Sequence, residues 1–414
     1  MGNFYESEEL AQDLNDALNR CIIDEKFSMK MLAREVEVCF ASHGFRDSEF
    51  RHGRKILVTR MDGLGDLVMT TPFLRELRRN EPHAHITLVV KPEYREVVEL
   101  CPYINTVYCF DSSPGYLHGA SKQFLDAIIA FSQLYLWTRT FDVCFVPRFD
   151  VDEFFDGFLC LMSGARQRFG FSEAVTPWKK LRTPGFDAIY NRTIPDLGYF
   201  HEVERSLSMI SFLGGTVRSH RLELWTAIDD EEWAEFTLHS SPRPIIAVSM
   251  GQLSDRRCWP VERYAELLQW LSEKESCSYV LLGSKVEVEL ANTLSSMANL
   301  PVILNLAGKT TLRQMMALLK RCQLYIGRDT GTKHIAAAAG VPVVEISCHS
   351  REVPPAAIPS PARYGPWGVP HVVVQPEKAT LPCVQSCSQN TAHCVLAVSV
   401  NQVKSGIMEL IEKA

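Results

Sequence analysis

The chain has 414 residues, which is too long for one ordinary hydrophobic core, so the sequence predicts two domains. Its hydrophobic content of 46% and charged content of 22% are typical of a globular protein, and the net charge of −6 argues against a general nucleic-acid binder. The sequence shows neither a signal-peptide pattern nor an apolar run of membrane-spanning length. This predicts a cytoplasmic protein without a membrane span and leaves peripheral membrane association open. The 13 cysteines, an odd number, indicate mostly reduced thiols.

Residues 1–52 read as an amphipathic helical extension. Leu10, Leu14 and Leu18 recur every four residues, and a similar series follows at 29–40. This predicts two or three helices ahead of the main fold. They would serve packing or oligomerisation, which makes a homo-oligomer one expectation, or they would dock a specific partner.

Strands and helices are expected to alternate in residues 53–241. A short apolar run at 55–60 is followed by the turn from Asp62 to Asp66, and Thr71-Pro72 starts a helix. Further strands are expected at 85–90, 107–110 and 141–146, and a helix at 121–137. The segment from about 172 to 242 is the least regular, so the domain junction is placed at its end.

A second alternation fills residues 242–414. The expected strands are 244–249, 278–282, 301–304, 324–326 and 341–346, and the expected helices are 261–273, 285–298, 311–321, 332–339 and 400–413. Such alternation is typical of parallel sheets covered on both faces. The sequence therefore predicts an α/β protein with two doubly wound domains on either side of a cleft.

The turn after the strand at 324–326 carries unusual polarity. Asp329, Thr330, Lys333 and His334 lie where a buried strand gives way to a small-residue helix. The free N–H groups and positive dipole end of such a helix favour an anion. This turn is therefore the predicted place for the diphosphate of an activated donor.

Two ordered motifs resemble a known family. Residues 56–72 (ILVTRMDGLGDLVMTTP) and 306–342, with Asp329-Thr-Gly-Thr-Lys-His334 inside, are similar to the two signatures of glycosyltransferase family 9, the heptosyltransferases. The similarity covers residues 53–414. It implies a GT-B fold of two facing Rossmann-like domains. It also implies inverting transfer of a sugar, typically a heptose from ADP-β-heptose, with no cofactor required for catalysis.

By the resemblance, Asp66 occupies the position of the general base, which takes the proton of the attacking acceptor hydroxyl. Its alternative role is to cap the following helix, and Asp62 is the rival base. The glycines of the same turn, Gly63 and Gly65, are expected on the acceptor side together with Arg148, which follows a strand. Arg166 and Arg168 are a weaker acceptor-side pair that solvent exposure would explain equally well.

On the donor side, Arg257 precedes a Trp-Pro pair as a basic residue does in the family, and a cation there would offset charge on the leaving diphosphate. The remaining donor-side candidates are Gly283, Asp329, Thr330, Gly331, Thr332, Lys333 and His334. The sequence departs from the family pattern at Thr332-Lys333, where a small or apolar pair is common. It departs again at Ile346-Ser-Cys348, where Phe-Gly is more frequent.

A cysteine cluster near the C-terminus has the composition of a metal site. Cys383, Cys387 and Cys394, with the adjacent His393, are ligands suited to zinc or iron. The neighbours His393 and Cys394 are not expected to face one ion easily, and Cys348 or His349 would then complete the set. Similar segments in the branch of the family that modifies autotransporter proteins resemble an iron site. Free thiols packed on the core are the alternative, and a bound metal would be structural.

The sequence does not distinguish between a glycan acceptor and a hydroxyl group of a protein acceptor. Two other functions fit the same fold: a sugar-nucleotide epimerase, and a non-catalytic nucleotide-sugar-binding assembly subunit. A nicotinamide dehydrogenase is disfavoured, because residues 62–66 do not match the G-x-G-x-x-G spacing.

Overall fold

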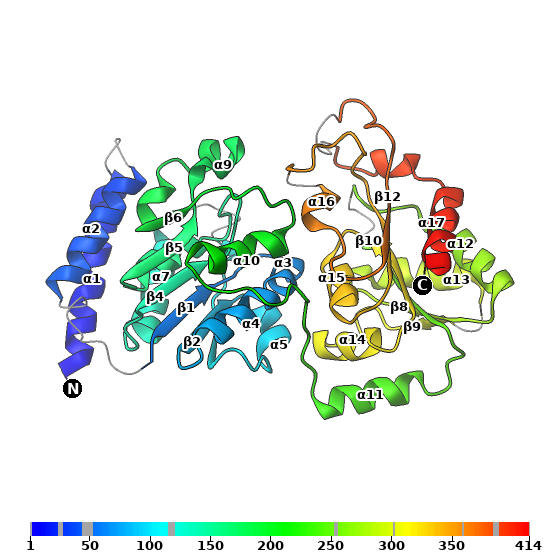
Figure 1. The fold of residues 1–414 in the computed structure, drawn as a ribbon, viewed down its shortest axis with the longest axis horizontal. Coiled ribbons are helices and arrows are strands. Elements are labelled where there is room, and N and C mark those ends of the chain that lie inside the picture. Colours follow the sequence, from blue (N-terminus) through cyan, green and yellow to red (C-terminus); the bar gives the residue numbers. More distant parts are fainter. Residues whose placement is uncertain are drawn as a thin grey trace.

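The computed structural model describes residues 2–23, 28–43, 53–114, 121–251, 256–300, 303–357, 360–383 and 389–413. They form two α/β domains side by side along the long axis of the molecule (Figure 1). Each domain contains a six-stranded sheet of parallel strands. Among these residues no helix combines the length and apolar character needed to cross a bilayer.

The first sheet has the order β3-β2-β1-β4-β5-β6. Its strands are β1 (Lys55–Thr59), β2 (His85–Val90), β3 (Thr106–Cys109), β4 (Val143–Val146), β5 (Gln167–Phe171) and β6 (Arg192–Ile194). The helices around it are α3 (Leu64–Met69), α4 (Thr71–Asn80), α5 (Arg95–Val98), α7 (Lys122–Phe131), α8 (Asp156–Met162), α9 (Pro177–Arg182) and α10 (Glu202–Phe212). Successive β1 residues serve opposite faces, with Ile56 and Val58 in one core and Leu57 in the other.

The second sheet has the order β12-β11-β10-β7-β8-β9. Its strands are β7 (Ile245–Ser249), β8 (Ser278–Leu281), β9 (Ile303–Asn305), β10 (Leu324–Arg328), β11 (Val343–Ile346) and β12 (His371–Val374). The helices around it are α11 (Ile228–Leu238), α12 (Val261–Lys274), α13 (Val288–Ala298), α14 (Leu312–Leu319), α15 (Gly331–Ala338), α16 (Pro361–Tyr364) and α17 (Val400–Lys413).

In both sheets the order of the strands reverses beside the first strand, so that later strands are added on its other side. This switch lies between β1 and β4 in the first sheet and between β7 and β10 in the second. Open parallel sheets bind ligands outside the carboxyl ends of the strands at such a switch point. The loops that follow these four strands are therefore where a ligand is expected.

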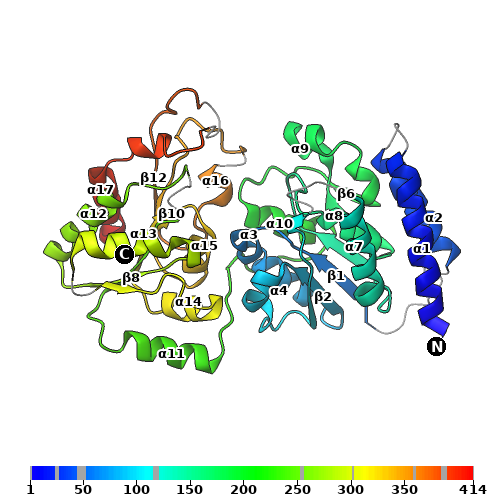
Figure 2. The same ribbon diagram turned by 180° about the vertical axis from the view of Figure 1, so that it is seen from behind.

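The N-terminal extension forms two helices, α1 (Gly2–Ile23) and α2 (Met29–Ser42), that cover the outer side of the first domain. Leu10, Leu14 and Leu18 are buried, as are Leu32 and Val36 of α2, and they share a core with α7 and α8. Figure 2 shows from behind that both helices lie far from the second domain. They thus pack on the fold, in agreement with the packing alternative.

The sequence analysis did not predict three short strands. β5, β6 and β12 were not expected, and β6 falls within the segment judged irregular. β6 has only three residues, of which Arg192 is exposed, so it shows no apolar run. Between β6 and β7, helix α11 packs against α14 of the second domain. The domain boundary near residue 242 stays a prediction.

Candidate active site

A cavity of about 610 Å³ opens at the carboxyl edge of the second sheet, at its switch point. It is lined by Gly251, Arg257, Gly283, Ser284, Lys285, Val286, Glu287, Gly308, Thr310, Thr311, Leu312, Met315, Arg328, Thr330, Gly331 and Thr332, and by Leu64 of the first domain. The expected donor residues Arg257, Gly283 and Thr330–Thr332 therefore surround one space. We name it the donor cavity.

Three cationic side chains line the donor cavity: Arg257, Lys285 and Arg328. Arg328 ends β10 and is buried, and its guanidinium lies so close under Gly251 that any side chain there would collide with it. Gly251 also has φ +83°, a backbone conformation that favours glycine. Sequence analysis missed Arg328 and Lys285. The available signal was a charged residue ending an otherwise apolar strand.

Glycine also shapes the far wall of the cavity. Gly308 has φ +68°, and its backbone N–H donates to the carbonyl of Gly283 at 2.9 Å. This bond holds the loop after β9 against the loop after β8. A Cβ on Gly308 would lie 2.8 Å from Cγ2 of Val288, so this close approach needs glycine.

The turn from Asp329 to Thr332 joins β10 to α15. Thr330 precedes the helix, and Gly331 and Thr332 supply first-turn N–H groups beside the cavity. Asp329 faces Lys333 with Oδ1 2.6 Å from Nζ. Burial would raise the pKa of Asp329, but the Lys333 ammonium outweighs it and lowers that pKa, so Asp329 is ionised.

Lys333 differs from its expected role. Its side chain is fully buried and does not line the donor cavity, because its ammonium is held by Asp329, Glu345 and the carbonyl of Tyr364. His334 is also buried and absent from the cavity lining. Burial and the Lys333 charge place the pKa of His334 well below its ordinary value, so its imidazole is neutral.

The two candidate bases in the first domain differ sharply in environment. Asp62 is 1% exposed and is ion-paired with both Arg60 and Arg148. Asp66, in the first turn of α3, is 28% exposed, and its Oδ1 lies 3.4 Å from Nη2 of Arg60. Burial raises the pKa of Asp66, and Arg60 opposes that rise. Asp66 therefore combines solvent access with a raised pKa, which are properties of a general base, whereas Asp62 is buried and paired.

Helix α3 of the first domain contacts α15 of the second. In each helix a glycine lies against a side chain of the other helix. A Cβ on Gly65 would lie 2.6 Å from His334 Cδ2, and one on Gly331 would lie 2.7 Å from the Cβ of Leu64. Gly63 caps α3, and a Cβ there would lie 3.3 Å from Oδ2 of Asp66. The turn bearing Asp66 and the turn lining the donor cavity are thus in direct contact.

The other cations expected on the acceptor side are largely engaged. Arg148 pairs with Asp62 and also donates to the carbonyl of Val151. Arg168 is buried and donates to Glu37 of α2 at 2.6 Å, so it ties the N-terminal helices to the domain rather than facing an acceptor. Lys91, which sequence analysis missed, lies with Nζ 3.5 Å from the ring centroid of Phe154.

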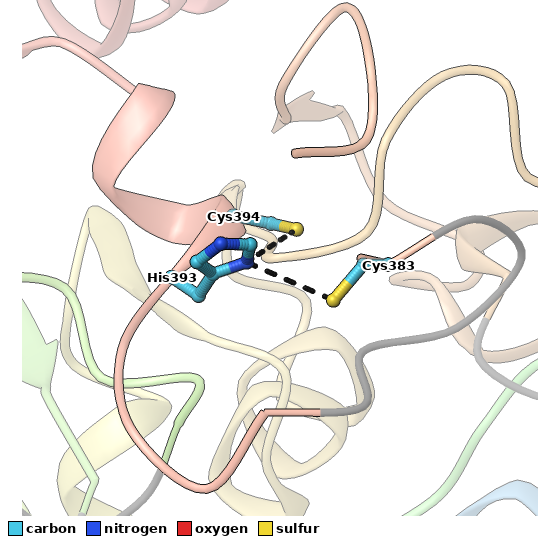
Figure 3. A group of neighbouring side chains, drawn as sticks. All are labelled: Cys383, His393 and Cys394. Carbon is cyan, nitrogen blue, oxygen red and sulfur yellow. Dashed lines mark hydrogen bonds between the residues drawn. The ribbon is translucent and has the colours of Figure 1, made fainter. Parts of the chain in front are cut away.

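The cysteine cluster brings together donors that were not expected to converge. Cys383, His393 and Cys394 have ligand atoms within 4.8 Å of one another, and His393 Nδ1 lies 3.7 Å from Cys383 Sγ and 3.6 Å from Cys394 Sγ (Figure 3). The expectation that His393 and Cys394 diverge was wrong, because the chain turns into a 3₁₀ helix at Cys394 and brings both side chains to one side. Cys348 and His349 do not join this group, and Cys387 lies outside the described residues.

The two sulfur–nitrogen separations of the cluster are compatible with a tetrahedral metal ion. With zinc–sulfur and zinc–nitrogen bonds of about 2.3 and 2.05 Å, a tetrahedral angle places sulfur about 3.6 Å from nitrogen. The two separations found agree with this value. Both sulfurs are buried, so an ion there would be structural.

Comparison with known proteins agrees with this geometry. The model of glycosyltransferase family 9 (heptosyltransferase) matches residues 156–392. The chain belongs to glycosyltransferase family 9. The lipopolysaccharide core heptosyltransferase OpsX of Haemophilus influenzae is 22% identical over 294 residues, covering 70% of this chain and 78% of the relative.

Two solved structures share the fold. The family 9 glycosyltransferase of Veillonella parvula DSM 2008 has a TM-score of 0.71 at 19% identity, covering 89% of this chain and 100% of that one. The Escherichia coli heptosyltransferase WaaC with ADP-2-deoxy-2-fluoro heptose has a TM-score of 0.61 at 17% identity, covering 86% and 99%. The chain is thus a heptosyltransferase-type glycosyltransferase with the GT-B fold, as the sequence motifs predicted.

Proposed function

We propose that the protein is an inverting heptosyltransferase that moves a heptose from ADP-β-heptose to a hydroxyl of a glycan or protein acceptor. The observation that carries the proposal is the contact between the Asp66 turn and the donor turn across the cleft. This contact brings a partly exposed carboxylate beside the place where a nucleotide-sugar would present its anomeric carbon.

The donor cavity provides the groups that a diphosphate needs. Arg257, Lys285 and Arg328 supply positive charge, and the N–H groups of Gly331 and Thr332 start a helix beside it. As the glycosidic bond to phosphate breaks, negative charge grows on the departing ADP. Fixed donors and cations near that charge favour the transition state over the bound substrate.

Asp66 completes the reaction as general base. It takes the proton of the acceptor hydroxyl while the oxygen attacks the anomeric carbon from the face opposite ADP, which inverts that centre. Its partial burial and raised pKa suit proton uptake. Asp62, buried between two arginines, serves instead to hold Arg60 and Arg148.

The acceptor would lie against the first domain, near Asp66. Lys91 and Arg148 both lie over the ring of Phe154, with 3.5 and 5.8 Å to the ring centroid. Since Arg148 is already paired with Asp62, Lys91 is the cation beside this ring that would suit a sugar carrying an acidic group.

Calorimetric binding of ADP, UDP, GDP and ADP-β-heptose tests the donor assignment. We expect binding of ADP, tighter with the heptose attached, and weaker binding of UDP and GDP. Preference for UDP or GDP would overturn the assignment of the donor. Conversion of the free donor without any acceptor would favour an epimerase, and absence of all binding would favour a non-catalytic assembly subunit.

A further inference from the structure

Lys333 has an environment that the proposed chemistry does not require. Its side chain is fully buried, and its ammonium donates to Asp329 Oδ1 at 2.6 Å, to Glu345 Oε2 at 3.0 Å and to the carbonyl of Tyr364 at 2.6 Å. These three acceptors satisfy the three N–H donors of an ammonium. Such complete satisfaction is the condition under which a lysine can stay charged in a protein interior.

The three partners come from three parts of the second domain. Asp329 belongs to the turn that lines the donor cavity, Glu345 to β11, and Tyr364 to the short helix α16. The Lys333 ammonium therefore links the donor turn to α16, and the bond to Tyr364 spans 31 residues of the sequence.

Helix α16 in turn contacts the first domain through Arg363. This side chain is fully buried, and it donates to Glu202 Oε1 at 2.6 and 3.0 Å and to Asp150 Oδ2 at 2.9 Å. Glu202 starts α10, and Asp150 follows β4, so both belong to the first domain. His201, which precedes Glu202, donates a hydrogen bond from Nε2 to the carbonyl of Gly365 at 3.1 Å, while its Nδ1 accepts from the backbone N–H of Val203.

A continuous polar path thus runs from the donor turn to the first domain. It passes from Asp329 to Lys333, then through the backbone of α16 to Arg363, and from there to Glu202 and Asp150. Burial excludes water from both cations along the path. Their bonds are therefore not screened as surface ion pairs would be.

We propose that Lys333 is a positioning residue that fixes the donor turn and couples donor binding to the placement of α16 against the first domain. The proposal rests on the proposed function, because coupling of this kind requires a donor to bind in the cavity that the turn lines. A small or apolar residue at this position could not make any of the three bonds. The coupling is therefore a property of chains that carry lysine here, rather than of the fold itself.

Lys333→Met, Lys333→Arg and Arg363→Lys test the proposal, with Lys404→Met as the matched control. Lys404 is a half-buried lysine of α17 whose Nζ lies 3.0 Å from Glu266, and it does not line the donor cavity. The readouts are calorimetric ADP affinity and amide hydrogen exchange of residues 201–208 with and without ADP. The exchange measurement separates coupling from stability, because it reports on the domain that does not hold the donor cavity.

We expect Lys333→Met to weaken ADP binding at least tenfold and to abolish the slowing of exchange that ADP causes at residues 201–208. Lys333→Arg should restore part of both effects. Arg363→Lys should bind ADP within threefold of the unaltered protein and yet lose the slowing. Lys404→Met should change neither.

Two results would overturn the proposal: ADP affinity within twofold of normal in Lys333→Met, or undiminished slowing at residues 201–208. If the unaltered protein binds no ADP, the proposed function fails separately. Exchange without ligand then decides the role of Lys333, because loss of the path should speed exchange at residues 201–208 in Lys333→Met but not in Lys404→Met. Equal exchange in both variants would reject the coupling.

Discussion

Gly65 of the first domain touches His334 of the second so closely that a Cβ on Gly65 would lie 2.6 Å from Cδ2 of the imidazole. The contact joins the turn that bears Asp66 to the helix that starts at the donor cavity. The contact sets the separation between Asp66 and the donor cavity and leaves no room for a side chain at Gly65.

Gly65→Ala should therefore push α3 away from α15 and misplace Asp66. We expect kcat/KM for transfer to fall at least about tenfold, which corresponds to about 1.4 kcal/mol, since small displacements in an active site are costly. Steady-state kinetics measure the loss. Adding His334→Ala, which removes the ring that the new Cβ meets, should restore part of the activity, because His334 does not line the donor cavity. No recovery in the double variant would show that the imidazole has a further role.

Asp66→Asn should lower kcat about 10²–10⁴-fold, the range that general bases contribute, while ADP affinity stays close to normal. Asp62→Asn is the matched comparison. It removes the buried partner of Arg60 and Arg148, so it should lower the free energy of unfolding by about 3–5 kcal/mol. Rates and chemical unfolding of both variants measure these effects. A fully active Asp66→Asn enzyme would remove Asp66 from the role of base.

The raised pKa of Asp66 predicts the direction of a pH effect on the rate. Asp66 accepts a proton only when ionised, and burial moves its pKa upward from the ordinary aspartate value. The rate should therefore rise with pH through a limb that lies above the range of an exposed aspartate. A profile of kcat/KM against pH measures it. If the residual activity of Asp66→Asn still rises over the same pH range, the rise belongs to another titrating group.

Arg257→Ala should raise the Kd for ADP about 10–100-fold, because a hydrogen bond to a charged group contributes about 1.5–3 kcal/mol. Its neighbour Arg256 is exposed and does not line the donor cavity, so Arg256→Ala controls for loss of charge alone. Calorimetry at two salt concentrations separates a direct contact with ADP from long-range attraction, because salt screens the long-range attraction more strongly. Equal effects of both substitutions would indicate long-range attraction rather than contact.

The cluster of Cys383, His393 and Cys394 should bind one zinc or iron ion per chain, measured by elemental mass spectrometry. Removing the metal with a chelator, or substituting Cys383→Ser, should lower Tm and leave ADP affinity unchanged, because the ion would tie down the C-terminal segment. Cys109→Ser, at a half-buried thiol on β3, is the control. Metal content unaffected by Cys383→Ser would place the ion elsewhere.

Local patterns predicted the fold well, and they predicted several of the residues that line the cavity. The apolar run at 324–326, the small-residue helix after it and the polar turn between them identify a strand, a helix and a ligand edge without tertiary information. Thr330, Gly331 and Thr332 accordingly line the cavity. Asp66 and Asp62 could not be told apart, because only the fold buries one of them between two arginines.

The misplaced residues depend on contacts between distant segments. Lys333 is drawn away from the cavity by Glu345 and by α16, neither of which its local sequence reveals. His393 and Cys394 converge because of a turn that residue spacing does not specify. β6 is too short and too exposed to give an alternating pattern.

The position of α1 and α2 at the outer end of the long axis has a practical consequence. A dye on the exposed Val38 of α2 and another on the exposed Ile411 of α17 would lie on different domains, and neither would touch the donor cavity. Energy transfer between them would report any change in the distance between the two domains when a nucleotide is added. The helical extension thus provides a labelling site for single-molecule fluorescence measurements.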